Sequence, residues 1–159
     1  PSLALGHRWQ LGWLFGGRDV PIIASIFDLE GEGGEVAARL WWVLKKDDAN
    51  RLGRRLLAHP ALSNSFGSNA GAALGEAANL VASACSTALG TMAHTDVLPT
   101  TPELRDTLVS ELVGPRDETS EQTVLWAPFV STNAPFFSGW LVLLLEHGVR
   151  EHVSRRMGL

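Results

Sequence analysis

The stretch that decides the fold is "NAGAALGEAANLVASACSTALGTM", Asn69 to Met92, in which Glu76 is the only charged side chain. Small and apolar residues recur along it at helical spacing, so the sequence predicts one long helix over about residues 70–93. The polar loop before it offers Ser68 or Asn69 as the N-cap. An ordinary exposed helix face carries Lys, Glu and Arg, so the near absence of charge needs an explanation.

Placing the residues at 100° intervals around the helix separates two faces. The residues that we expect to face the core are Leu74, Ala78, Val81, Cys85, Ala88, Leu89 and Met92. The opposite face is small and polar and comprises Ala72, Glu76, Asn79, Ser83, Thr87 and Gly90. Glu76 and Asn79 are three positions apart and therefore project as neighbours.

Two interpretations of this small face stay open. Small residues let another backbone approach closely, and the carboxylate of Glu76 and the carboxamide of Asn79 are the groups that would reach into a partner. Alternatively, another part of the same protein covers the face, and both side chains bond locally.

The elements around the helix are predicted from β-branched runs, turns and caps. Strands at 20–29 and 35–44 form a hairpin around the turn "EGEGG", and a short helix at 47–58 follows, with Asp47 as its N-cap. Further along, we expect a helical stretch at 105–112, a second hairpin made by "EQTVLWAPFV" and "FFSGWLVLLL", and a closing helix in "GVREHVSRRMG".

The order of hairpin and short helix at 20–58 returns at 122–158, and Gly34 corresponds to Gly139 in this alignment. We therefore expect one α+β domain over 1–159. Its antiparallel sheet would consist of two pseudo-repeated hairpins, with helices packed over one side. His94, near the end of the long helix, is expected to take a capping role.

Composition limits the classes of function. The net charge of −4 argues against nucleic acid and anionic membranes as partners. No apolar run approaches the roughly 20 residues needed to span a bilayer. The single cysteine and the absence of a visible signal peptide suggest a cytoplasmic protein. Trp9 and Trp13, four positions apart, suggest an exposed patch or an oligomer contact, and a homodimer is one possibility.

The run "AALGEAANLVASACSTAL" resembles the CheC/CheX/FliY family of chemotaxis phosphatases, whose mark is a helix bearing Glu-x-x-Asn. The resemblance extends to "AARLWWVLKKDDANRLGRRLLA" before the helix and to "VLPTTPEL" and "SGWLVLLL" after it, about residues 30–159 in all. It implies a CheC-like fold and a single-motif protein of the CheX or CheC type. A second motif helix is not visible in the sequence.

The resemblance also implies a substrate, the phosphoaspartate of a CheY-like receiver domain, which itself holds the Mg²⁺. Asn79 would orient the attacking water, and Glu76 would pair with a receiver lysine. Ser83, Thr87 and Ala72 would line the docking surface. Positioning one water is most of what an activated acyl phosphate requires, so we expect no metal or cofactor bound by this chain.

A second hypothesis assigns the same face to a non-catalytic module that binds a receiver, a flagellar-switch component or a second copy of the chain. The family often has glycine four residues after the motif Asn, where this chain has Ser83. That departure and the missing second motif helix favour the non-catalytic module. No group of residues in the sequence favours the hypothesis of an enzyme that acts on a small molecule.

Overall fold

The computed structural model describes residues 2–57, 68–115, 121–132 and 136–145. The strands are β1 (Ser2–His7), β2 (Pro21–Glu30), β3 (Val36–Lys45), β4 (Leu98–Pro99), β5 (Glu103–Leu108), β6 (Glu121–Val130) and β7 (Ser138–Leu145). The helices are η1 (Arg8–Gln10), α1 (Leu11–Leu14), η2 (Glu32–Gly34), α2 (Lys46–Leu56), α3 (Ser68–Ala93) and α4 (Val109–Val113). None of the helices described is long and apolar enough to cross a membrane.

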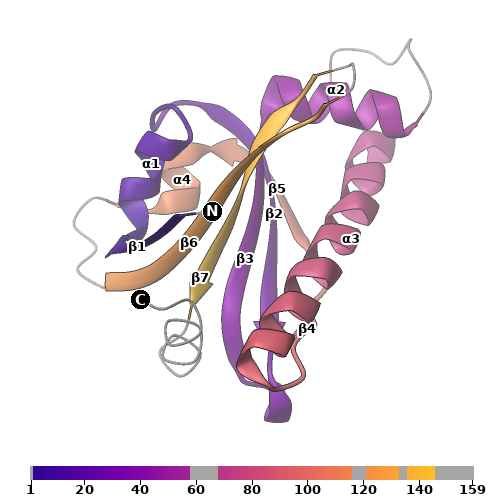
Figure 1. The fold of residues 1–159 in the computed structure, drawn as a ribbon. Coiled ribbons are helices and arrows are strands. Elements are labelled where there is room, and N and C mark those ends of the chain that lie inside the picture. Colours follow the sequence, from indigo (N-terminus) through magenta and orange to yellow (C-terminus); the bar gives the residue numbers. More distant parts are fainter. Residues whose placement is uncertain (1, 58–67, 116–120, 133–135, 146–159) are drawn as a thin grey trace.

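All seven strands join one antiparallel sheet in the order β1-β6-β7-β3-β2, with β4 and β5 both paired to β2. The two predicted hairpins are present as β2–β3 and β6–β7. They meet at the centre of the sheet, where Trp41 of β3 is opposite Val142 of β7. The predicted α+β class with an antiparallel sheet is therefore confirmed (Figure 1).

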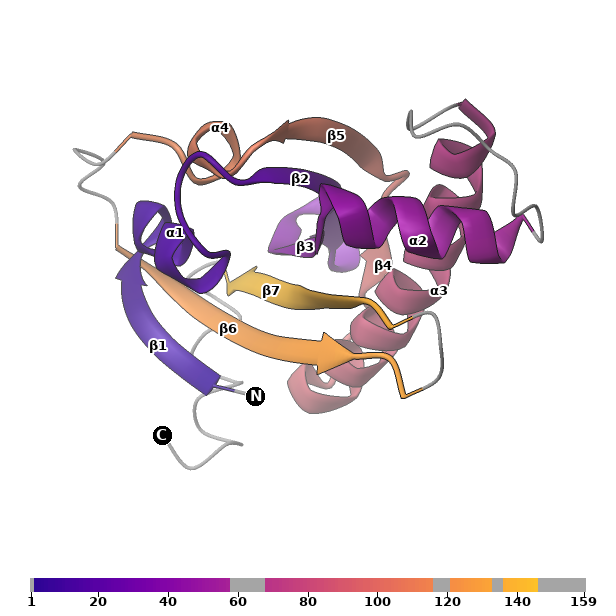
Figure 2. The same cartoon turned by 90° about the horizontal axis from the view of Figure 1, so that it is seen from above.

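Helices cover both faces of this sheet, so the expectation that they pack over one side is wrong (Figure 2). On one face, α2 and α3 bury residues such as Phe27, Leu40 and Trp42. On the other face, α1 and α4 bury Trp41 and Val43. Neighbouring residues of a strand point to opposite faces, so the burial of both Trp41 and Trp42 requires cover on two sides.

Helix α2 is held in place by a close crossing and by a buried carboxylate. A Cβ atom on Gly53 would lie 3.1 Å from the Cβ of Ala70, so α2 and α3 approach most closely where one of them has no side chain. The Asp48 carboxylate accepts hydrogen bonds from the Ser138 hydroxyl at 3.0 Å and from Arg51 at 3.0 Å. This carboxylate ties the start of α2 to the start of β7.

The predicted N-caps of α2 and α3 are wrong. Asp47 is not the N-cap of α2, because Lys45 precedes the helix and makes no side-chain cap bond. Asp47 lies instead in the first turn, where a negative charge favours the helix dipole. Helix α3 begins at Ser68, so Asn69 is inside its first turn.

The stretch 105–112 is not one helix. Its first half belongs to β5, which pairs with β2 from Pro21 to Ile26, and α4 begins only at Val109. The pairing is between segments about 80 positions apart, and local propensity carries no information about it.

Gly34 and Gly139 are not equivalent, although the repeat aligns them. Gly34 has a φ of +78° in the turn after β2. Gly139 lies within β7, where a Cβ atom would come within 2.5 Å of the carbonyl oxygen of Val43. The predicted closing helix lies outside the described residues, and the pseudo-repeat stays a prediction.

Residues 2–19, for which no element was predicted, include β1, η1 and α1. Trp9 and Trp13, which were expected to form one exposed patch or contact, differ in their surroundings. Trp13 is 83% exposed, whereas Trp9 is half-buried against the core beneath α1 and α4.

Candidate functional site: the exposed face of helix α3

One side of α3 packs on the sheet. Leu74, Ala78, Ala82 and Leu89 are buried there against β2 and β3, and Ser86 is 3% exposed. Of the predicted core face, Val81, Cys85 and Met92 are half-buried. Ala88 is exposed, so the prediction that it faces the core is wrong.

The opposite side of α3 faces outward along most of the helix (Figure 1). We call it the α3 outer face, and its exposed members are Ala72, Glu76, Leu80, Ser83, Ala84, Thr87, Ala88 and Thr91. Glu76 is the only charged residue among them. The predicted members Ala72, Glu76, Ser83 and Thr87 all lie here.

Gly90 does not belong to this face, contrary to the prediction. A Cβ atom at Gly90 would lie 2.7 Å from the carbonyl oxygen of Thr95, because the chain folds back over the end of the helix. His94 terminates α3 with a φ of +56°, and the Thr95 N–H donates to the Gly90 carbonyl at 3.1 Å. His94 thus occupies the left-handed position of a C-terminal capping motif, so its expected capping role operates through the backbone.

Glu76 is exposed and Asn79 is half-buried beside it. Within the described residues, neither side chain takes part in a hydrogen bond or an ion pair. Three positions along a helix place the two groups on adjacent turns. The carboxylate and the carboxamide are therefore neighbouring polar groups that the described part of the fold does not engage.

The threonine hydroxyl groups further along the α3 outer face are turned back onto the helix. Thr87 Oγ1 donates to the Ser83 carbonyl at 2.8 Å, and Thr91 Oγ1 donates to the Thr87 carbonyl at 2.9 Å. Each threonine consequently presents its methyl group outward. This part of the α3 outer face is thus smooth and mainly apolar, which allows another molecule to approach closely.

The sequence interpretation missed Leu80. This side chain is 76% exposed, directly follows Asn79 and lies four positions after Glu76. A large apolar side chain in a mostly small face is a contact that a partner would bury. The signal was present in the sequence, because the 100° periodicity places Leu80 only about 40° from Glu76 and about 20° from Thr87 around the helix axis.

Cys85 lies on the inward side of the helix, half-buried against the core. Burial raises the pKa of its thiol, because desolvation disfavours the thiolate. It remains a neutral thiol near pH 7 and contributes packing to α3.

Sequence comparison finds neither a matching protein-family model nor a matching curated protein. Structural comparison finds similar folds. FliY of Thermotoga maritima matches with a TM-score of 0.66 at 13% identity, covering 98% of this chain and 80% of FliY. The FliM middle domain of H. pylori matches with a TM-score of 0.65 at 11% identity, covering 99% of this chain and 79% of that one.

FliM in the FliM–SpeE complex from H. pylori matches with a TM-score of 0.63 at 11% identity, covering 99% of this chain and 77% of that one. These likenesses concern the fold. The chain has the CheC-like α+β fold that the FliY and FliM structures share.

Proposed function

We propose that this chain dephosphorylates the phosphoaspartate of a CheY-like receiver domain that docks on the α3 outer face. The observation that carries the proposal is the pair Glu76 and Asn79, two neighbouring polar groups that no described residue engages, on an otherwise nearly uncharged helix face. The resemblance to the Glu-x-x-Asn motif and the fold shared with FliY support it.

Asn79 is the residue that would act at phosphorus. A carboxamide both donates and accepts hydrogen bonds, so it can hold a water by its oxygen while its NH₂ group contacts the phosphoryl group. Holding the water in line with the phosphorus–oxygen bond that breaks replaces a random collision with solvent by attack from a fixed position. The metal ion belongs to the receiver, so this chain supplies the position of the water only.

Glu76 would fix the complex by pairing with a cationic side chain beside the phosphorylated aspartate. The pair would be desolvated when the two surfaces meet, and losing the carboxylate should weaken binding by about 1–3 kcal/mol. The small side chains of the α3 outer face permit that close approach.

The experiment is a phosphate-release assay with phosphorylated receiver domains from the same organism. Asn79→Ala should lower the stimulated rate by about 100-fold, because a misplaced water loses most of the benefit of positioning. Asn69→Ala is the matched control, since it removes the same group from an exposed site in the first turn of α3. Equal rates for wild type and Asn79→Ala would refute the mechanism.

The second candidate function is a non-catalytic module that binds the same receiver. Two observations favour it. Ser83 replaces the glycine of the resembled motif, and α3 is the one motif helix among the residues described. This alternative predicts that wild type binds the receiver without accelerating phosphate release, and that Glu76→Ala weakens binding while Asn79→Ala does not.

A further inference from the structure

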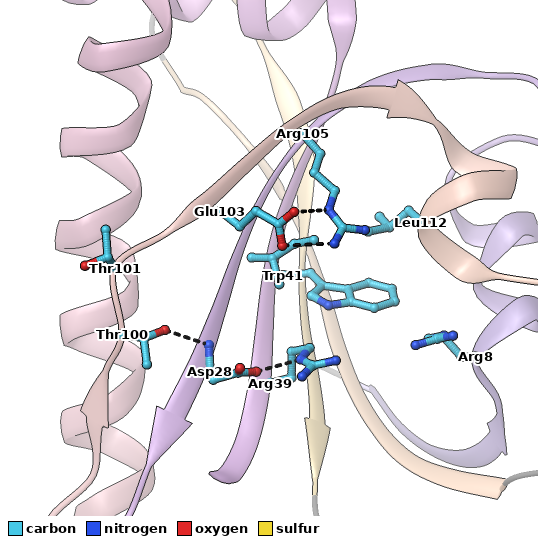
Figure 3. A pocket seen from close by; sticks show the side chains of 10 residues that line it. Arg8, Asp28, Arg39, Trp41, Thr100, Thr101, Glu103, Arg105 and Leu112 are labelled. Carbon is cyan, nitrogen blue, oxygen red and sulfur yellow. Dashed lines mark hydrogen bonds and ion pairs between the residues drawn. The ribbon is translucent and has the colours of Figure 1, made fainter. Parts of the chain in front are cut away.

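A cavity lies on the opposite face of the sheet from α3. It has a volume of about 210 Å³, and α4 contributes Leu112 to its wall. Its polar lining comprises Arg8, Asp28, Arg39, Trp41, Thr100, Thr101, Glu103 and Arg105 (Figure 3). The proposed docking on the α3 outer face uses none of these residues.

Trp41 provides the central observation. Its side chain is 2% exposed, and its indole Nε1–H is buried without a hydrogen-bond acceptor in the described structure. An unpaired buried donor costs about 1–3 kcal/mol, and such groups in native proteins usually indicate an acceptor that is still to be identified. Figure 3 shows the indole nitrogen on the side of the ring that faces Arg39.

The carboxylates in the lining bond to arginines. Glu103 accepts from Arg105 through both of its oxygens, at 2.7 and 2.9 Å, and Asp28 accepts from Nε of Arg39 at 2.6 Å. The bond to Arg105 lowers the pKa of Glu103, so that carboxylate stays ionised at neutral pH. None of these bonds involves the Trp41 N–H, which has no acceptor in the described structure.

Arg39, in contrast, has hydrogen-bond donors that these carboxylates do not use. Arg105 and Arg39 pair with the two carboxylates, and Arg8 is a third cationic residue of the lining. Arg39 uses only Nε, and its two terminal nitrogens make no bond within the described residues. Arg8 donates from Nε to the Val113 carbonyl at 3.3 Å, which fixes its guanidinium at the cavity wall.

We propose that this cavity binds a small anion through a carboxylate or phosphate oxygen, which accepts from Trp41 Nε1–H and from the terminal nitrogens of Arg39. Anionic oxygens are acceptors only and match the planar fork of a guanidinium. The cavity is smaller than the 300–1,000 Å³ of typical sites for drug-sized ligands. Its occupant is therefore the size of inorganic phosphate or a short carboxylic acid.

The test follows the indole N–H signals of the full chain in a ¹H–¹⁵N spectrum, with the Trp41 signal identified as the one lost in Trp41→Phe. Sodium phosphate, sodium acetate and sodium chloride are titrated at matched ionic strength. The Trp41 signal should move and saturate with phosphate or acetate, and the more effective of the two identifies the ligand class. The Trp13 signal, from an 83% exposed side chain, should stay fixed.

Arg39→Gln should raise the concentration of anion needed for half-saturation by about tenfold, because the charge-assisted bonds are lost. The matched control Arg55→Gln, on an exposed site of α2, should leave it unchanged. A Trp41 signal that stays fixed, or that moves as much with chloride, would overturn the proposal and leave water as the occupant. Equal saturation in both variants would overturn the role of Arg39. If Arg39→Gln does not fold, the wild-type titration decides.

Discussion

The two sides of helix α3 have nearly the same composition and opposite surroundings. The inward side contains Leu74, Ala78 and Ala82 and is buried on the sheet, while the outward side contains Leu80, Ser83 and Ala84 and is exposed. Small side chains let α3 lie close to the sheet on the inside. On the outside, no described element packs against them, which agrees with the docking of a second molecule that we propose.

Substitutions on the two sides should therefore have different consequences. A change on the inward side alters the free energy of unfolding, because the lost contacts are with the sheet. A change on the outward side alters binding or dephosphorylation and leaves unfolding nearly unchanged. The following predictions test this contrast.

The largest effect is expected for Leu74→Ala, on the inward side. Leu74 is 1% exposed, and its truncation leaves a cavity between α3 and the sheet, so the free energy of unfolding should fall by about 3 kcal/mol. Urea unfolding measures it through a lower midpoint at an unchanged slope. A loss below about 1 kcal/mol would mean that the core relaxes around this position.

Leu80→Ala makes the same truncation on the outward side. Because Leu80 is exposed, the free energy of unfolding should change by less than about 0.5 kcal/mol. Binding of the receiver domain should weaken about tenfold, which corresponds to about 1.4 kcal/mol, and calorimetry measures it. Unchanged receiver affinity in Leu80→Ala would remove this part of the outer face from the docking surface.

Ser83→Gly tests whether the departure from the resembled motif limits activity. Removing the hydroxymethyl group should let the receiver approach more closely and speed phosphate release a few-fold, while the helix loses about 0.5–1 kcal/mol. Ala84→Gly is the control, because it introduces glycine one position away with at least as large a helix penalty. If both variants release phosphate at the wild-type rate, Ser83 does not hinder docking.

The smallest effect concerns Cys85 and pH. Its pKa is raised by burial, so the folded protein disfavours the thiolate. The resulting stability is fully present below the unfolded-state pKa of about 8.5 and is lost as pH rises through the higher folded-state pKa. Urea unfolding of wild type should show this decline above about pH 8.5, and Cys85→Ser should lack it.

Alkylation by iodoacetamide gives an independent measurement of the same contrast. Wild type should react slowly near neutral pH, since the thiolate is the reactive form. The double variant Ser83→Cys, Cys85→Ser moves the thiol to the outward side and should react faster. Equal rates for the inward and outward thiols would show that α3 opens away from the sheet on the timescale of the reaction.

Local patterns in the sequence determined most of the elements. The two hairpins and the long helix follow from strand runs, turns and helical spacing, and the same spacing places Glu76 beside Asn79 on the outward side. Leu80 could have been included by the same argument. Ala88 and Gly90 were misplaced, because the first is at the edge of the buried stripe and the second is covered by the chain after the helix.

Only the tertiary structure decided what depends on distant pairing. Residues 105–108 are a strand because the edge of β2 is free to pair with them, although their sequence alone equally permits a helix. Helices cover both faces because β3 buries consecutive tryptophans on opposite sides. The cavity around Trp41 brings together residues from η1, β2, β3, β5 and α4. Periodicity reports which residues share a face, and the packing of separate segments determines what each face meets.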